Sequence, residues 1–558
     1  MDRLKLKNTN LKIKLKILLL FIIHFYFHNN CVGQEQLSFI EKFTITTNNN
    51  IFIVGETLYY NVFITDKSNV LSNSSKIGYC YLINSDKKIV LQQKIIINNG
   101  VLNGDFIIPS ILQTGNYKLV ITTNNSLLKS TINNQIIDIY LINPFNNQDI
   151  NLKEVDTVYL SKSKFTIDDK NIPIFNTRSL VTFDFNNKEL IKGNYIVSAK
   201  RIDSVKISKK FLNKVKNSVD KSIIPEIRGE IISGVLYDLD NKPIENKYVS
   251  LSITNNQNIF KISKTNSEGV FYFNIFENYN DGDLIINLFN KDSINNYKIK
   301  LFDKHIPFIN NLKFNNLRIN KDLKNWLKSK SIYSQIENIY FNLKKDSLLI
   351  KNKAKMFYGN LSTNYLLDDY TRFFTIKETF TEVITSAYSR TIKDENLFYV
   401  HFNNLKIKLK NNYKALVLID GILINDGSIL YNFNPKLIKQ INTIDEYYIY
   451  GSKIFGGIID VKTFKGDFYP SVKNIIFKTH IKSPIFNKIY FTPDYKNFGQ
   501  LKHIPDYRTQ LLWDPNLKFE KGIISFYSSD VKGLYELNIN GFSNSGEKIN
   551  ISKYFIIK

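Results

Sequence analysis

The sequence predicts a mainly β, multidomain protein. Short apolar runs recur along the chain between clusters of Asn, Ser, Gly and Asp, which is typical of antiparallel strands joined by turns. With 558 residues the chain is too long for one ordinary domain, since domains mostly hold about 100–200 residues. Its hydrophobic fraction of 43%, with 14% aromatic residues, is enough to fill several folded cores. We therefore expect several β-sandwiches and one small α+β unit.

The first unit, residues 1–33, is predicted to be a signal peptide. A basic stretch precedes the apolar residues 17–27, which are too few to span a bilayer as a helix. Small residues at 31–33 suit a signal peptidase, so we expect the mature chain to begin at Gln34. A lipid-modified Cys31 is the alternative, although the two Asn residues before it fit that signal poorly. No later apolar run is long enough to predict a transmembrane helix in the mature chain.

The net charge invites a nucleic-acid interpretation, which the sequence does not favour. The chain carries 75 Lys and Arg against 50 Asp and Glu, a formal charge of +25. Such an excess attracts acidic partners when it is gathered on one element. Here the basic residues are spread over every segment of a chain that we expect to be exported. We therefore expect no nucleic-acid partner.

Residues 34–141 are predicted to form the first β-sandwich. Alternating apolar residues fill 51–64 and 117–121, and Gly55, Gly104 and Gly115 fall at turns. The sequence Gly55-Glu56-Thr-Leu and the later Gly115-Asn-Tyr resemble the opening and closing strands of the second macroglobulin-type domain (MG2) of the α2-macroglobulin family. That resemblance implies an immunoglobulin-like sandwich. Residues 142–226 are expected to form a second β-domain and a linker, and they carry no functional motif.

Residues 227–304 predict another small sandwich. Apolar strands at 232–238 and 249–252 flank a turn at Pro243, and Gly269 marks a later turn before a third strand. This succession resembles the carboxypeptidase regulatory-like domain. The resemblance implies a β-sandwich that accompanies enzymes and outer-membrane receptors and is not itself catalytic.

Residues 305–470 are predicted to contain helices and an α+β unit. Apolar residues recur at three- and four-residue steps over 320–343, which indicates a helix with Trp326 as a core anchor. A second helix is expected over 376–387. Asp368 and Asp369 are adjacent carboxylates, and we interpret them as helix caps rather than as a catalytic pair.

The most informative segment begins at residue 417. Apolar strands flank Asp420-Gly421, which is a strong signal for a tight hairpin. A short helix is expected over 434–442, strands over 444–450 and 458–463, and a glycine-rich loop over 451–457.

This order resembles the plug domain of TonB-dependent outer-membrane receptors, particularly those of Bacteroidota. The resemblance assigns a structural, not catalytic, motif to six residues, which are Asp420, Gly421, Tyr450, Gly451, Gly456 and Gly457. A phosphate-binding loop is the alternative for 451–457, but it needs Lys-Ser or Lys-Thr after its second glycine, where the chain has Gly457 and Ile458. A receptor also needs a barrel of some 20 strands after its plug, and too few residues follow to build one.

Residues 471–558 are predicted to form a C-terminal macroglobulin-like β-domain. The segment Trp513-Asp-Pro and the later Asp530-Val-Lys-Gly-Leu-Tyr resemble the start and return of such a domain, with Trp513 as a buried strand residue. The combination of modules resembles an envelope family of Bacteroidota without an assigned activity.

The chemistry of a catalytic or metal site is not evident in the sequence. The histidines are scattered singly, and no Gly-x-Ser-x-Gly elbow or thioester Cys-Gly-Glu-Gln segment occurs. Cys80 is expected to be a buried small apolar residue. We therefore predict no catalytic residue, no metal and no cofactor.

Three functional hypotheses follow. The first is a non-enzymatic exported protein of the periplasm or outer membrane that binds a partner protein, an outer-membrane β-barrel or another envelope protein, through its plug-like and sandwich domains. The second is a trans-acting plug component of a TonB-dependent uptake system. The third is an enzyme with unrecognised chemistry, which the missing motifs disfavour.

Overall fold

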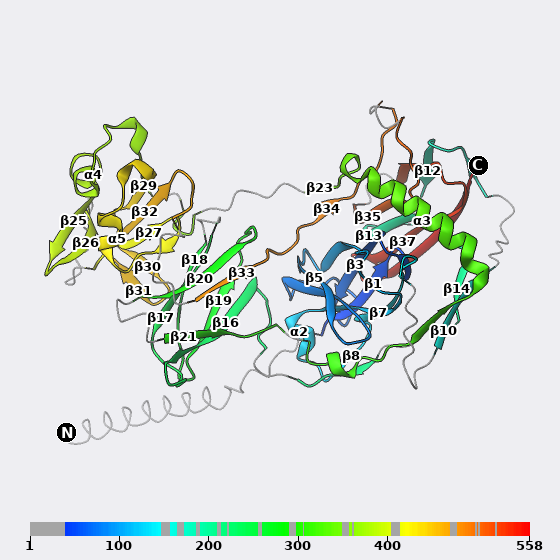
Figure 1. Ribbon diagram of the computed structural model, residues 1–558, viewed down its shortest axis with the longest axis horizontal. Coiled ribbons are helices and arrows are strands. Elements are labelled where there is room, and N and C mark those ends of the chain that lie inside the picture. Colours follow the sequence, from blue (N-terminus) through cyan, green and yellow to red (C-terminus); the bar gives the residue numbers. More distant parts are fainter. Residues whose placement is uncertain are drawn as a thin grey trace, which may run out of the picture. The chain divides into compact units, whose positions relative to one another are not determined.

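The computed structural model describes the chain from residue 40 onward, with gaps, and its strands are drawn in Figure 1. The described ranges are 40–146, 157–163, 172–185, 190–208, 214–219, 223–254, 259–289, 297–304, 306–348, 356–359, 362–402, 413–468, 477–496, 499, 503–518 and 522–558. The fold is mainly β, with several sheets and several hydrophobic cores, as the sequence predicts. The predicted signal peptide lies outside the described residues.

The first β-sandwich packs a three-stranded sheet against a five-stranded sheet. The three-stranded sheet has the order β1-β3-β6, from β1 (Lys42–Thr47), β3 (Thr57–Thr65) and β6 (Val101–Ile107). The other has the order β2-β9-β7-β4-β5, from β2 (Ile51–Ile53), β9 (Ile136–Ile142), β7 (Gly115–Thr122), β4 (Ile77–Ile83) and β5 (Ile89–Ile96). Both sheets contribute to one core. Cys80 is fully buried in that core, as predicted, and burial raises the pKa of its thiol.

Three small elements adjoin this sandwich. The short helix α2 (Asn124–Leu127) begins at a capping box between Thr123 and Ser126. A three-stranded sheet has the order β14-β10-β22, from β14 (Val205–Ile207), β10 (Thr157–Lys162) and β22 (Asn316–Ile319). A two-stranded sheet pairs β15 (Val215–Lys216) with β8 (Thr131–Ile132).

The C-terminal sandwich is built from two distant parts of the sequence. Its larger sheet has the order β11-β38-β37-β13-β35, from β11 (Ile174–Phe175), β38 (Lys548–Ile557), β37 (Gly533–Ser543), β13 (Gly193–Arg201) and β35 (Gln510–Lys518). Its smaller sheet pairs β12 (Leu180–Asp184) with β36 (Ile523–Tyr527). We expected 142–226 and 471–558 to form separate β-domains, but backbone hydrogen bonds join their strands in shared sheets with one core. This pairing spans more than 300 residues, and no local sequence pattern specifies it.

The sandwich expected over 227–304 is present and gains a strand from later in the chain. One sheet has the order β19-β16-β21, from β19 (Val270–Ile275), β16 (Glu230–Asp238) and β21 (Tyr297–Leu301). The other has the order β18-β17-β20-β33, from β18 (Phe260–Lys264), β17 (Tyr248–Ile253), β20 (Gly282–Leu288) and β33 (Phe477–Ile481). Strand β33 falls in the segment assigned by sequence to the C-terminal domain, yet it pairs with β20.

The described residues between 356 and 468 form a region that we call the inserted region. It lies between β23 (Ser347–Leu348) and β34 (Lys488–Ile489), which pair with each other. Its main sheet has the order β24-β29-β32-β27-β28, from β24 (Thr363–Leu366), β29 (Ile438–Ile444), β32 (Ile458–Thr463), β27 (Leu416–Ile419) and β28 (Ile422–Leu423). Two hairpins join β25 (Ala387–Ile392) to β26 (Glu395–Val400) and β30 (Tyr448–Tyr450) to β31 (Lys453–Phe455). The helices are α4 (Ile376–Glu382) and α5 (Gly427–Tyr431), with 3₁₀ turns η5 (Leu367–Asp369) and η6 (Pro435–Leu437).

The prediction of a helix over 434–442 is wrong beyond the first turn. Asn434 caps the 3₁₀ turn η6 by accepting a hydrogen bond from the backbone N–H of Lys436, so the local start signal is real. The chain then enters strand β29, whose Ile441 and Ile444 pair with β32. Tertiary pairing of β-branched residues therefore overrides the helix start.

The second expected helix is shorter than predicted, and its cap is a different residue. Helix α4 ends at Glu382, before β-branched residues lead into β25. Thr375 and Glu378 form its capping box. Asp368 caps nothing and pairs with Arg372 instead, so the capping role expected for Asp368 and Asp369 is wrong.

The helix expected over 320–343 is confirmed as an element. It comprises η3 (Lys321–Leu323), α3 (Lys324–Ile339) and η4 (Phe341–Leu343), and a further 3₁₀ turn, η2 (Ile309–Asn311), precedes it. Trp326 and Leu327 pack against the core of the first sandwich, as predicted for Trp326. The C-terminal half of α3 differs from that expectation, because several of its apolar side chains face solvent.

Candidate functional site

Asp420 and Gly421 form the predicted hairpin turn between β27 and β28. Both residues have positive φ, 50° for Asp420 and 80° for Gly421, as a type I′ turn requires. The buried Asp420 carboxylate accepts hydrogen bonds from Thr463 N at 2.9 Å, Thr463 Oγ1 at 2.6 Å and Phe468 N at 3.1 Å. Its role is therefore to fasten the turn to the end of β32.

A second carboxylate near this turn was not singled out by the sequence. Asp460, on β32, is buried, and its Oδ2 accepts a hydrogen bond of 2.7 Å from the Tyr358 hydroxyl. Burial raises the pKa of Asp460 to about 6, although the hydrogen bond from Tyr358 opposes that change. Its spacing in the sequence is that of an ordinary strand residue, so only the fold reveals it.

Tyr450 and Gly451 lie at the turn of the β30–β31 hairpin. We expected a loop over 451–457, but Tyr450 pairs with Lys453 and only Gly451 and Ser452 form the turn. Gly451 has φ of 61°, a conformation that glycine adopts readily. The Tyr450 hydroxyl donates a hydrogen bond of 2.6 Å to the backbone carbonyl of Phe260 on β18.

Gly456 and Gly457 allow close backbone packing, as the sequence predicts. A Cβ on Gly456 would lie 2.0 Å from the carbonyl oxygen of Tyr413. A Cβ on Gly457 would lie 2.4 Å from the carbonyl oxygen of Ile444, and its φ is 89°. Neither position tolerates a larger side chain without a backbone shift.

The motif residues face the preceding sandwich of the same chain. Ser252 Oγ donates a hydrogen bond of 2.7 Å to the backbone carbonyl of Gly421, and Tyr248 and Ser452 share a hydrogen bond of 2.9 Å. Phe260 of the sandwich is fully buried in one cluster with Leu418 and Phe455 of the inserted region. The motif therefore anchors the inserted region to the sandwich and presents no open site.

Five of the exposed apolar side chains of the inserted region lie on or next to β24, η5, η6 and the end of β32. We call this set the apolar rim, and it consists of Leu366, Tyr370, Phe374, Leu437 and Phe464. Phe374 is 80% exposed. The rim includes the end of β24, which is an edge strand of its sheet. Exposed apolar side chains gathered in this way mark interaction surfaces.

Arg372 holds the segments of the apolar rim together. Its Nη1 donates hydrogen bonds to the backbone carbonyls of Pro435 at 3.0 Å and Ile438 at 2.6 Å. The same guanidinium lies 5.4 Å from the ring centroid of Phe464. Lys436 lies 5.2 Å from the ring centroid of Phe374. These contacts keep the rim side chains in place without burying them.

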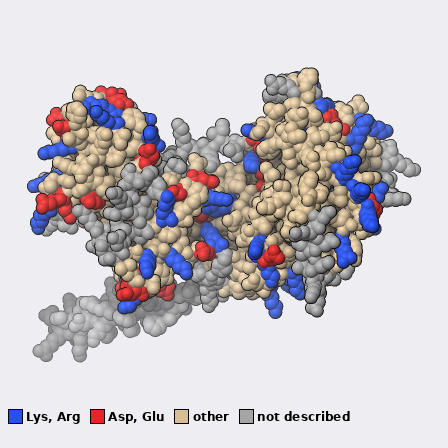
Figure 2. All heavy atoms as spheres, viewed as in Figure 1, with Lys and Arg blue, Asp and Glu red and all other residues tan. Residues whose placement is uncertain are grey.

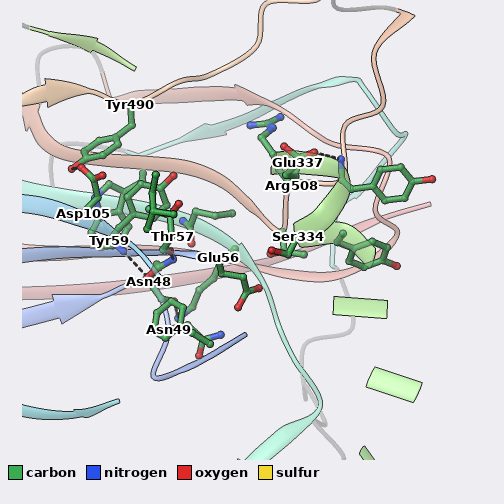
Figure 3. A pocket seen from close by; sticks show the side chains of 18 of the residues that line it. Asn48, Asn49, Glu56, Thr57, Tyr59, Asp105, Ser334, Glu337, Tyr490 and Arg508 are labelled. Atoms are coloured by element: carbon green, nitrogen blue, oxygen red, sulfur yellow. Dashed lines mark hydrogen bonds between the residues drawn. The ribbon is translucent and has the colours of Figure 1, made fainter. Parts of the chain in front are cut away.

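A cavity of about 270 Å³ lies between α3, the turn from β2 to β3 and the start of β35, and Figure 3 shows it from close by. Asn48 accepts a hydrogen bond from the backbone N–H of Tyr59 at 3.0 Å. Glu337 accepts one from the backbone N–H of Tyr507 at 2.6 Å and pairs with Lys344 at 2.7 Å. Burial raises the pKa of the Glu337 carboxyl, which Lys344 opposes.

Other charged groups at this cavity also have partners of opposite charge. Arg508 pairs with Asp506 at 2.8 Å, and Lys488 pairs with Asp105 at 2.6 Å. Trp513 is buried in β35, as predicted, and stacks on Tyr59 with ring centroids 5.7 Å apart. The described lining residues include neither histidine nor cysteine. The cavity is therefore a polar junction between elements, and its lining has no nucleophile and base pair of the usual kind.

A metal site is not evident elsewhere in the described ranges either. Among those residues no group of three His, Cys, Asp or Glu side chains is arranged to hold a metal ion. His480 is exposed and lies 3.4 Å from Asp283. No helix in the described part of the chain is both long and apolar enough to span a membrane.

No protein-family model matches the chain, and no curated protein matches it. Among solved structures, trypsin-activated α2-macroglobulin from Escherichia coli matches 93% of this chain at 7% identity with a TM-score of 0.24, over 42% of its own length. Salmonella α2-macroglobulin reacted with methylamine matches 93% at 7% identity with a TM-score of 0.22, over 39% of its length. The adhesin InvE of Yersinia pseudotuberculosis matches 46% at 10% identity with a TM-score of 0.14, over 57% of its length. TM-scores this low carry no argument about function, so the site rests on its own geometry.

Proposed function

We propose that this chain is an exported, non-enzymatic envelope protein that binds a partner protein, an outer-membrane β-barrel, through the inserted region and the sandwiches that carry it. The basic and apolar N-terminal segment of the sequence supports export, and the plug-like order of motifs supports a location in the periplasm or at the outer membrane.

The observation that carries the proposal is the apolar rim. Its five side chains are exposed on a region whose own core is complete, with Ile376, Ile419 and Ile438 fully or almost fully buried. Burying an exposed Phe or Leu side chain contributes about 1.5–3 kcal/mol. A partner that covers the rim therefore gains the free energy of burying these side chains, which folding of the chain alone does not provide.

The anchoring of the inserted region also supports partner binding. Its motif side packs on the preceding sandwich through Gly421 and Tyr450, while the rim comes from β24, the segment after η5, η6 and Phe464. A region held on one side and apolar on another suits an adaptor that presents a surface.

The same packing favours the adaptor over a trans-acting plug. To enter the barrel of a separate protein as a plug, the inserted region would have to break the hydrogen bonds that Gly421 and Tyr450 make with the sandwich. Leaving the buried carbonyls of Gly421 and Phe260 without donors costs about 1–3 kcal/mol each.

Affinity purification from detergent-solubilised envelopes tests the proposal. The double variant Phe374→Ser and Leu437→Ser should no longer recover a β-barrel protein that the unchanged chain recovers. A matched control is Phe276→Ser, because Phe276 is also strongly exposed but lies outside the inserted region. Recovery of the unchanged chain alone in a soluble fraction would overturn the proposal.

A further inference from the structure

The C-terminal half of helix α3 is amphipathic in the reverse sense to an ordinary surface helix. Trp326 and Leu327, near its start, pack on the core, but from Lys330 onward polar side chains face the body of the protein while Ile332 and Ile339 face solvent. In a surface helix the apolar stripe normally faces the core. This inversion leaves an apolar helix face without a partner among the described residues.

The inward side chains of α3 are fixed by specific contacts. Lys330 is buried and lies 3.4 Å from both Glu56 and Asp203. One and two turns further on, Ser334 and Asn338 lie at the cavity, and Asn338 Nδ2 donates a hydrogen bond of 3.0 Å to the carbonyl of Gly55. Positions four apart share one face of a helix, so these contacts determine the rotation of α3 about its axis.

The outward side chains form an apolar seam, which consists of Ile332, Ile336 and Ile339. Ile332 is 43% exposed, Ile339 is 73% exposed, and Ile336 is partly exposed. The seam continues into exposed Phe341 and Leu343 of η4. Steps of four and three residues are the spacing of a coiled-coil seam.

On α3 itself the exposed polar neighbours of the seam are uncharged or basic. Lys324 and Lys328 are exposed before it and Lys345 after it. The only carboxylate within α3 is Glu337, which faces the cavity. Figure 2 shows a largely uncharged surface where the C-terminal half of α3 lies in Figure 1, with side chains of both charges at its margin.

We infer that the α3 seam is a docking site for an amphipathic helix of another protein, one with an apolar stripe and acidic flanking residues. Heptad spacing fits a helix, and the lysines at both ends fit acidic flanks. A second copy of this chain would bring lysine against lysine in either orientation. A lipid surface needs a wider apolar face than this one, which exposed Gln335 and Asn342 border. This site is separate from the apolar rim and does not depend on the proposed function.

A designed peptide tests the inference on the mature full-length chain. The probe is a labelled four-heptad peptide with Ile and Leu at the seam positions and Glu at the flanking positions, and the matched peptide carries Lys in place of Glu. We expect the acidic peptide to bind, and the basic peptide to bind at least about tenfold more weakly, by fluorescence anisotropy. Ile339→Ser should weaken binding of the acidic peptide at least about tenfold. Ile449→Ser, at a similarly exposed Ile of β30, should leave binding unchanged.

The other outcomes overturn the inference. They are no binding of either peptide, equal binding of both, or binding that Ile339→Ser does not change. Vesicles of phosphatidylethanolamine and phosphatidylglycerol that bind the chain through Ile339 would assign the seam to a membrane instead. A dimer in sedimentation that Ile339→Ser dissociates would assign it to a second copy.

Discussion

The hydroxyl of Tyr450 donates a hydrogen bond of 2.6 Å to the backbone carbonyl of Phe260, and this contact joins the inserted region to the preceding sandwich. The two rings also stack with their centroids 6.1 Å apart, and Phe260 is fully buried. The motif tyrosine thus serves the packing of one part of the chain on another.

Tyr450→Phe should destabilise this junction. The change removes the hydroxyl but keeps the ring, so the carbonyl of Phe260 loses its donor while the stacking remains. We expect a loss of about 1 kcal/mol in the free energy of unfolding, measured with urea. Tyr272→Phe is the control, since Tyr272 is exposed on β19 and should change stability little. Equal effects of the two changes would contradict the role of Tyr450.

Gly457→Ala should be far more harmful than Gly451→Ala. Both glycines have positive φ, so both changes cost about 1–2 kcal/mol in backbone strain. Only Gly457 is also crowded, with its would-be Cβ 2.4 Å from the carbonyl of Ile444, whereas open space surrounds that of Gly451. We expect Gly457→Ala to cost a further 1–3 kcal/mol, roughly the cost of overpacking, in thermal or urea unfolding. Similar losses for both variants would show that crowding at Gly457 is not decisive.

Asp460 should make stability fall as the pH rises. Its pKa is raised from 3.8 to about 6 in the fold, so the folded state holds a proton that the unfolded state has released. Stability should therefore decline between about pH 4 and pH 6, by on the order of 3 kcal/mol in total, and then level off. Asp460→Asn should abolish this decline, so the difference in unfolding free energy between wild type and variant should fall by a similar amount, as urea unfolding from pH 4 to pH 7 would measure. A difference that is constant over that range would refute the assignment.

Lys330 should be essential for the packing of α3 against the body of the protein. Its ammonium lies between Glu56 and Asp203, and Lys330→Met leaves two carboxylates without that cation. We expect a loss of about 3–5 kcal/mol in the free energy of unfolding. Lys328→Met is the matched control on the same helix, because Lys328 is exposed and should change stability by less than about 0.5 kcal/mol. A tolerated Lys330→Met would mean that other contacts orient the helix.

Local features of the fold follow well from the sequence. The Asp420-Gly421 turn depends on two adjacent residues that accept positive φ, and Gly456 and Gly457 depend on the absence of a Cβ. The buried position of Trp513 follows from its strand. Each of these predictions rests on a residue type and on the residues next to it in the sequence.

Features that depend on distant pairing do not follow from the sequence. Strand β13 lies between β35 and β37, and β33 completes a sheet formed some 200 residues earlier. The helix-start signal at Asn434 produces only a short 3₁₀ turn, because the residues that follow form β29 and pair with β32. The outward face of α3 could not be predicted either, because its apolar spacing is that of an ordinary core helix and only the buried Lys330 reverses it.

The most direct test of partner binding is photo-crosslinking in intact envelopes, with a photoreactive residue in place of Phe374. Phe374 is 80% exposed at the apolar rim, so a bound partner should lie within reach of it. We predict a crosslink from position 374 to an outer-membrane β-barrel protein and none from position 276. No crosslink from position 374, or the same products from both positions, would contradict it.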